Sequence, residues 1–127
     1  MRVLFVCTGN ICRSPFAEVV ARAEGLEAES AGLEAYGGAE PTGDAIAVAR
    51  ELGYDLSSHR ARGLSQVIER PDVVVGMTAA HVSALGGSAR LLGEADLEDP
   101  IGCGRDTYRR VYAQIEKDVQ RLKEELA

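Results

Sequence analysis

The chain has no long apolar segment, although 46% of its 127 residues are hydrophobic. A membrane-spanning helix needs about 20 consecutive apolar residues, and no run in this sequence approaches that length. The stretch Val3–Val6 is also too short for the apolar part of a signal peptide, and it leads directly into polar residues. We therefore expect no membrane span and no secretory leader.

Cysteine is scarce, with three residues in the whole chain. An odd number of cysteines cannot all pair within one chain, which argues against the disulfide framework of a small secreted protein. We therefore expect reduced thiols and a cytoplasmic location. With 127 residues, the chain is long enough to bury a core without disulfides or a structural metal. Residues 1–127 are expected to form a single domain.

Lysine is also scarce, and the balance of charge is acidic. Lys117 and Lys123 are the only lysines among 14 basic residues, and the net charge is -6. Because affinity for nucleic acid comes from clustered positive charge, this composition excludes a general nucleic-acid-binding protein. A cationic site in this chain would use arginine, whose planar guanidinium can hold an oxyanion through two hydrogen bonds.

Short apolar runs alternate with segments of helical spacing, which predicts an α/β fold with a parallel sheet in three layers. The segments with the composition of strands are Val3–Val6, Glu27–Ser30, Asp72–Met77 and Ala89–Leu92. The segments with helical spacing are Phe16–Glu24, Thr42 or Asp44 to Leu52, Thr78–Leu85 and Gly104–Leu126. One or two helical turns are expected within Leu64–Glu69. The last helix should bury one apolar stripe, formed by Tyr108, Val111, Ile115, Val119 and Leu122.

The residues that carry chemistry follow the first predicted strand, in the loop Cys7-Thr8-Gly9-Asn10-Ile11-Cys12-Arg13-Ser14. A loop between a buried strand and a helix N-terminus can direct its backbone N–H groups at phosphate oxygens. The same positive field stabilises a thiolate, so we predict that Cys7 is a nucleophile. Arg13 can hold two phosphoryl oxygens, and Ser14 can donate a hydrogen bond to the sulfur. Gly9 and Asn10 are residue types that accept left-handed backbone angles.

Such a nucleophile needs a partner that handles protons. A leaving alkoxide or phenoxide departs more easily when it is protonated, and water that later attacks the phosphocysteine needs a base. One carboxyl group can do both. From the residues alone, Asp96, Glu98 and Asp99 are equal candidates among 20 acidic residues.

The loop resembles that of the low-molecular-weight protein tyrosine phosphatase family. The family pattern V-C-x-G-N-x-C-R-S-P matches V-C-T-G-N-I-C-R-S-P at Val6–Pro15. The likeness continues through Ser30-Ala31-Gly32, Leu56–Arg62, Asp72–Met77 and Asp99-Pro100, with Tyr108 beyond. It implies the fold of that family, a four-stranded parallel sheet with helices on both faces.

The resemblance also implies roles for individual residues. Asp99 would be the general acid that acts with Cys7 and Arg13. A hydrogen-bond network that holds the loop open would consist of Asn10, Ser14, Ser30 and His59. The walls of the substrate cleft would be Ile11, Tyr36 and Ile101.

Other residues have more than one interpretation. Cys12 could form an intraloop disulfide with Cys7 and shield the nucleophile from irreversible oxidation, or it could be a small apolar filler. A catalytic base is the alternative role for His59, and His81 is expected at the surface. The thiols and histidines lack the spacing of common zinc sites, so we expect no metal. No organic cofactor is required either.

The predicted function is hydrolysis of a phosphomonoester through a phosphocysteine intermediate. The expected substrate is protein phosphotyrosine or a small aryl phosphate, with inorganic phosphate as product and ligand. A monomer or weak dimer is expected.

Two alternatives remain open. Phosphoarginine phosphatases, a bacterial branch of the same family, resemble this chain in the small residues after Asp99-Pro100 but tend to carry Thr where Ile11 stands. An arsenate reductase would use the same loop, but it requires resolving thiols, for which Cys12 and Cys103 are the candidates.

Overall fold

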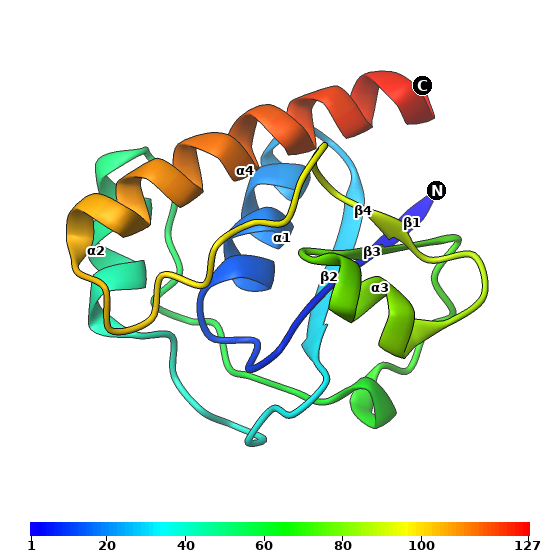
Figure 1. The fold of residues 1–127 in the computed structure, drawn as a ribbon, viewed down its shortest axis with the longest axis horizontal. Helices are drawn as coiled ribbons and strands as arrows, with labels where there is room; N and C mark the ends of the chain where they lie inside the picture. The colour runs from blue at the N-terminus through cyan, green and yellow to red at the C-terminus, as the bar shows by residue number, and fades with distance from the viewer.

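Residues 1–127, described by a computed structural model, fold around one parallel four-stranded sheet in the order β2-β1-β3-β4 (Figure 1). The strands are β1 (Arg2–Cys7), β2 (Glu27–Gly32), β3 (Val73–Gly76) and β4 (Arg90–Leu91). The helices are α1 (Arg13–Ala23), α2 (Gly43–Glu51), α3 (Ala79–Leu85) and α4 (Arg105–Leu126), with a short 3-10 turn at Leu64–Gln66. The predicted fold class is confirmed.

Strand β1 lies at the centre of the sheet and is buried on both faces. Because successive side chains of a strand point to opposite faces, Phe5 and Cys7 join the large core while Leu4 and Val6 join a smaller cluster. Both neighbours of β1 run parallel to it. Its carboxyl end, at Cys7, therefore lies at the edge where open α/β sheets bind ligands.

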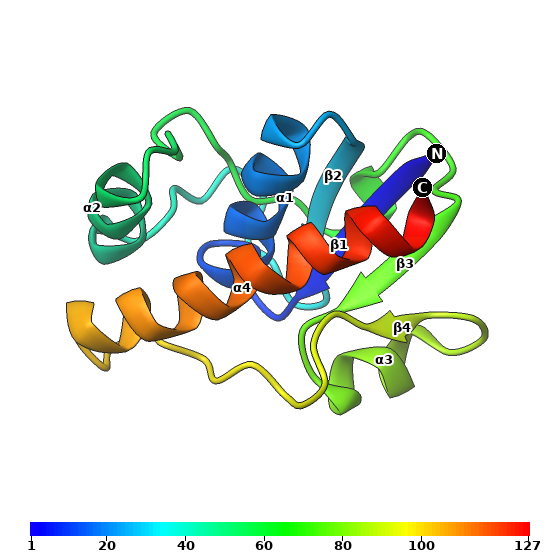
Figure 2. The same cartoon turned by 90° about the horizontal axis from the view of Figure 1, so that it is seen from above.

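Helices α1 and α4 pack together over one face of the sheet (Figure 2). The rings of Phe16 and Tyr112 stack between them, with centroids 3.9 Å apart and planes within 6° of parallel. The apolar stripe predicted for the last helix is buried. Burial on α4 also includes Tyr112 and Asp118, which the predicted stripe omits.

The opposite face of the sheet is covered in part by α3. Leu85 of this helix packs against the smaller cluster, which contains Leu4 and Val6. Helices therefore lie on both faces, as expected. No helix is both long and apolar enough to cross a membrane. The two chain ends lie near each other, away from the carboxyl end of β1 (Figures 1 and 2).

The start of α1 differs from the prediction. This helix begins at Arg13, three residues before Phe16, so Pro15 lies inside its first turn. The first N–H groups of a helix have no partner within the helix, and a residue that lacks this group is therefore tolerated there. The shift places Arg13 on a regular element rather than in the loop.

Two boundaries that the sequence left open are decided by the structure. Thr42 is the N-cap of α2, because its Oγ1 accepts a hydrogen bond from the backbone N–H of Ala45 at 3.2 Å. The helical turns expected within Leu64–Glu69 are reduced to the single 3-10 turn.

Candidate active site

The loop between β1 and α1 spans residues 8–12, and its backbone N–H groups make no hydrogen bond to another backbone group. Asn10 adopts a left-handed conformation with φ of 56°, whereas Gly9 does not have a positive φ. Gly32 allows the end of β2 to lie close to the loop, because a Cβ at this position would be 2.6 Å from the Thr8 carbonyl oxygen. Unpaired N–H groups at a helix N-terminus form a cradle for an anion.

Cys7 lies at the bottom of this loop, where it is 1% exposed. Its Sγ is 2.9 Å from the Oγ of Ser14. The same Oγ accepts a hydrogen bond from Nδ2 of Asn10 at 2.9 Å. The hydroxyl hydrogen of Ser14 is therefore free to donate a hydrogen bond to the sulfur of Cys7.

Asn10 connects the loop to its surroundings. Its Nδ2 also donates to Ser30 Oγ at 2.9 Å, and its Oδ1 accepts from the backbone N–H of Arg62 at 3.0 Å. The Nε2 of His59 lies 2.9 Å from the Asn10 carbonyl oxygen. Burial lowers the pKa of His59, so the ring is neutral near pH 7. The structure thus brings Asn10, Ser14, Ser30 and His59 together.

A buried carboxylate extends this network beyond the residues singled out from the sequence. Ser30 Oγ donates to Oε1 of Glu18 at 2.5 Å, and Glu18 pairs with Arg22 at 3.0 Å. Glu18 is only 9% exposed. The sequence could have indicated Glu18, because it lies four residues after Ser14 on one helix and such residues share a helix face.

Arg13 is held beside the loop at 4% exposure. Its Nη1 donates to the Leu97 carbonyl oxygen at 3.1 Å. Its Nε is buried without a hydrogen-bond partner. Because a buried N–H without a partner costs free energy, this group is suited to donate a hydrogen bond to an oxyanion at the mouth of the loop.

Asp99 reaches the same guanidinium from a distant part of the chain. Its Oδ2 is 3.6 Å from Nη2 of Arg13. Its Oδ1 accepts from the Ile101 N–H at 3.2 Å and contacts the Cys12 Sγ at 3.7 Å. Of the three carboxyl groups that sequence alone left equal, Asp96 instead accepts from the Ala79 N–H, and Glu98 pairs with Arg110.

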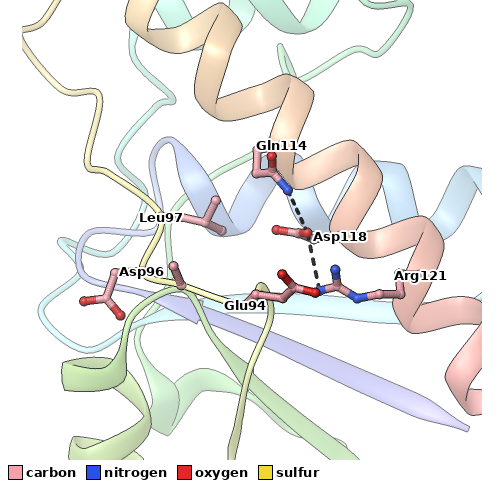
Figure 3. Close-up of a pocket in the computed structure, with 7 residues that line it drawn as sticks. Glu94, Asp96, Leu97, Gln114, Asp118 and Arg121 are labelled. Carbon is pink, nitrogen blue, oxygen red and sulfur yellow. Dashed lines mark hydrogen bonds and ion pairs between the residues drawn. The ribbon is translucent and has the colours of Figure 1, made fainter.

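A polar cluster on α4, formed by Gln114, Asp118 and Arg121, faces the segment Glu94–Leu97 that precedes Asp99 (Figure 3). Buried Asp118 accepts from Nε2 of Gln114 at 2.9 Å and pairs with Arg121 at 3.4 Å. Arg121 also donates to the Leu92 carbonyl oxygen at 3.0 Å. A cavity of about 370 Å³ lies between this cluster and residues 94–97. The cluster therefore supports the acid-bearing loop from behind and lies outside the catalytic cleft.

The residues predicted to line the cleft are more exposed to solvent than Cys7 and Arg13 at its base. Tyr36 is 86% exposed, Ile101 is 48% exposed, and Ile11 is partly buried. A second cavity of about 370 Å³ borders the loop at Thr8 and Arg13, with His81 in its lining. His81 was expected at the surface, and this is wrong: it is 5% exposed, and its Nε2 lies 2.9 Å from the Thr8 Oγ1.

All three cysteines are free thiols. Burial, followed by the nearby Cys7 and Asp99 groups, raises the pKa of Cys12 to about 12. Cys103 is exposed and contacts only carbonyl oxygens of its own loop. No group of three or more side chains has the arrangement of a metal site.

The whole sequence is similar to one known family. A profile of the family described as low molecular weight phosphotyrosine protein phosphatase matches residues 2–127. The low molecular weight protein-tyrosine-phosphatase of Streptomyces coelicolor is 38% identical over 91% of this chain and 87% of the relative. The low molecular weight protein-tyrosine-phosphatase Wzb of Escherichia coli K12 is 37% identical over 93% and 90%, respectively.

Solved structures agree with this similarity. The low molecular weight protein tyrosine phosphatase from T. tengcongensis has a TM-score of 0.89 at 34% identity, covering 98% of this chain and 99% of that one. Wzb from Escherichia coli K30, in complex with sulphate, has a TM-score of 0.91 at 28% identity over 99% and 98%. The YwlE arginine phosphatase from Geobacillus stearothermophilus has a TM-score of 0.84 at 29% identity over 98% and 92%. The chain therefore belongs to the low molecular weight phosphotyrosine protein phosphatase family.

Proposed function

We propose that this protein hydrolyses phosphotyrosine in proteins through a phosphocysteine intermediate at Cys7. The observation that carries the proposal is that a nucleophile, an anion-binding loop and an acid lie together at the carboxyl end of β1. Cys7 supplies the sulfur, the loop supplies unpaired N–H groups, and Arg13 lies 3.6 Å from the carboxylate of Asp99. The names of the relatives support the same substrate class.

In the first step, the thiolate of Cys7 attacks the phosphorus atom and displaces the phenolate oxygen. The loop N–H groups and Nε of Arg13 bind the equatorial oxygens as negative charge redistributes. Asp99, which is partly exposed at the rim, gives its proton to the leaving oxygen. The protonated product departs as a neutral phenol.

In the second step, water attacks the phosphocysteine and Cys7 leaves as a thiolate. Asp99, now ionised, takes a proton from the attacking water. Ser14 stabilises the departing sulfur, because its hydroxyl hydrogen is free to donate to it. Inorganic phosphate is released, and no metal or organic cofactor takes part in these steps.

The thiols and the length of the chain bear on where and in what form the enzyme acts. Three free thiols support a cytoplasmic location, where cysteines stay reduced. We propose that residues 1–127 act as one phosphatase domain, as a monomer or weak dimer. Cys12, buried in the same loop as Cys7, is the proposed partner for a protective disulfide.

Replacement of the nucleophile tests the proposal directly. Cys7→Ser should abolish turnover of an aryl phosphate, because a hydroxyl at this position is a far weaker nucleophile than a thiolate. Cys103→Ser is the matched control, since that thiol is exposed and lies outside the loop. Steady-state rates of both variants decide the matter: wild-type turnover by Cys7→Ser would refute a phosphocysteine mechanism.

The role of Asp99 has its own test. Asp99→Asn keeps the shape of the side chain but removes the transferable proton, so kcat should fall by about 10²- to 10⁴-fold. Glu98→Gln is the matched control, because Glu98 pairs with Arg110 at the surface. Rates on aryl phosphates with good and poor leaving groups complete the test. The loss should be smallest for the best leaving group, and an equal loss for all of them would contradict an acid role.

Substrate preference depends on the apolar wall at Ile11. An aryl ring gains from contact with this side chain, whereas a phosphorylated guanidinium favours a hydroxyl. Wild-type protein should therefore hydrolyse phosphotyrosine peptides faster than matched phosphoarginine peptides. Ile11→Thr should narrow this ratio. Faster turnover of phosphoarginine by the wild type would reverse the proposed substrate.

A further inference from the structure

His81 lies against the phosphate-binding loop, although it is 73 residues from Thr8 in the chain. Its Nε2 is 2.9 Å from the Thr8 Oγ1, and the residue is 5% exposed. It forms part of the wall of the cavity that Thr8 and Arg13 also line. None of the reaction steps derived above uses this ring.

The backbone around His81 is fixed by three features. Thr78 caps α3 by accepting the His81 N–H at 3.2 Å, and Asp96 accepts the Ala79 N–H at 2.7 Å. Gly76 allows α3 to lie this close to β3, because a Cβ there would lie 3.0 Å from the His81 Cβ and 3.2 Å from the Val82 backbone nitrogen. His81 is therefore a rigid support rather than a mobile side chain.

Thr8 is the point where that support meets the loop. It directly follows Cys7, and its carbonyl oxygen accepts the Glu34 N–H at 2.9 Å. Its own N–H makes no hydrogen bond to another backbone group and is the first donor of the cradle. Although Thr8 is exposed, its hydroxyl is held by His81. Two contacts, one to its hydroxyl and one to its carbonyl oxygen, thus hold Thr8, the residue directly after the nucleophile.

We propose that His81 is a positioning residue for phosphoryl binding, acting through the side chain of Thr8 on the first N–H groups of the loop. A misplaced donor weakens binding of both the substrate phosphoryl group and inorganic phosphate, because the same N–H groups hold both. This inference rests on the proposed function, but phosphate binding can be measured without turnover.

The charge state of the ring fits this role. Burial and the Arg13 guanidinium lower the pKa of His81, while Asp96 and Asp99 act in the opposite direction. Its Nδ1 is buried and has no hydrogen-bond partner. A second ring proton would therefore be placed where no acceptor exists and next to a positive charge. The neutral ring is left with one hydrogen bond, the one to Thr8.

A double-mutant cycle tests the proposal. Thr8→Val removes the hydroxyl with little change of shape, and His81→Leu removes the ring nitrogen. Each should weaken binding of inorganic phosphate, measured by calorimetry, by about 2- to 10-fold, the range expected for one neutral hydrogen bond. Each should also lower kcat/KM by the same factor. The double variant should be no weaker than either single variant, because both remove the same contact.

Further variants separate positioning from general stability. His81→Gln keeps a polar group that can reach Thr8 and should recover most of the phosphate affinity. Ser83→Ala, at an exposed position on the same helix, should leave both affinity and thermal unfolding unchanged. Thr8→Val keeps the test valid even if His81→Leu fails to fold, since Thr8 is exposed.

The possible outcomes distinguish the role of His81 from the proposed function. Additive losses in the double variant, or unchanged phosphate affinity in Thr8→Val, would overturn the role of His81. Wild-type protein that binds phosphate but hydrolyses no aryl phosphate would instead overturn the proposed function, and the cycle on phosphate affinity would still decide the inference about His81.

Discussion

At the residue scale, Cys7 and Cys12 share one loop but have different surroundings. The Cys7 sulfur contacts the Ser14 hydroxyl, whereas the Cys12 sulfur faces the Asp99 carboxylate at 3.7 Å. Both thiols are buried, and the nearby negative charge of Asp99 further opposes the ionisation of Cys12. Two thiols five residues apart are therefore suited to different tasks.

Alkylation should distinguish these thiols. Because the pKa of Cys12 is raised to about 12, this thiol stays protonated near pH 7 and should resist iodoacetamide. Cys7 and the exposed Cys103 should react, and peptide mass spectrometry identifies the modified sites. Inorganic phosphate should protect Cys7 but not Cys103. Labelling of Cys12 as fast as Cys7 would contradict this assignment.

The two histidines predict how stability depends on pH. Burial lowers the pKa of both His59 and His81 below the ordinary value of 6.5. As pH falls below that value, the unfolded chain takes up protons that the folded protein resists, so stability is lost. It is recovered as pH rises again.

His59→Gln isolates one of these contributions. The variant cannot take up a proton at this position, so its stability should fall less steeply than that of wild type as pH is lowered from 7 to 5. Urea unfolding at several pH values measures the difference. Parallel pH curves for the two proteins would show that folding does not lower the pKa of His59.

At the element scale, the acid-bearing loop depends on residues far behind the site. Gly93 packs directly against Asp118, whose Oδ2 is buried without a hydrogen-bond partner. Leu97 follows four residues later and binds Arg13 through its carbonyl oxygen. A displacement at Gly93 can therefore reach the catalytic guanidinium along a short, well-anchored segment.

Gly93→Ala should destabilise the fold by about 1–3 kcal/mol, the range for overpacking, because Gln114 and Arg121 hold the Asp118 carboxylate in place. The added Cβ would lie 2.6 Å from Asp118 Oδ2. Gly43→Ala is the control, because it lies in α2 with no atom within 4 Å of the added Cβ. The thermal unfolding temperature and kcat/KM should both fall for Gly93→Ala, and neither should fall for Gly43→Ala. Equal stability of the two variants would mean that the segment shifts freely.

At the scale of the whole molecule, α1 and α4 join the catalytic loop to the main core. Phe16 of α1 is fully buried and stacks on Tyr112 of α4. Tyr112 donates its O–H to the Cys12 carbonyl oxygen at 2.7 Å. One aromatic pair therefore supports both the core and the end of the phosphate-binding loop.

Phe16→Ala should cost about 3–5 kcal/mol, as expected when a buried aromatic side chain leaves a cavity. Tyr112→Phe keeps the packing but leaves the Cys12 carbonyl oxygen without its partner, so it should cost about 1–3 kcal/mol. Ile68→Ala is the control at 94% exposure and should change stability by less than about 0.5 kcal/mol. Denaturant unfolding ranks the three, and a loss for Ile68→Ala as large as for Phe16→Ala would contradict this description of the core.

Much of this arrangement follows from local sequence. The run from Val3 to Val6 is apolar without alternation, and this pattern belongs to a strand buried on both faces. The order of strand, loop and helix around Cys7 and Arg13 also follows from local signals. These features depend on neighbours in the chain, so the sequence by itself determined them.

Only the tertiary structure decided which distant groups meet at the loop. Residue type alone does not distinguish the carboxyl groups of Asp96, Glu98 and Asp99 as candidates for the acid. The path of the chain brings Asp99 to the Arg13 guanidinium. Local pattern placed His81 at the surface, whereas the parallel pairing of β1 with β3 carries α3 against Thr8. A contact across 73 residues depends on how the strands pair, and no local spacing encodes that pairing.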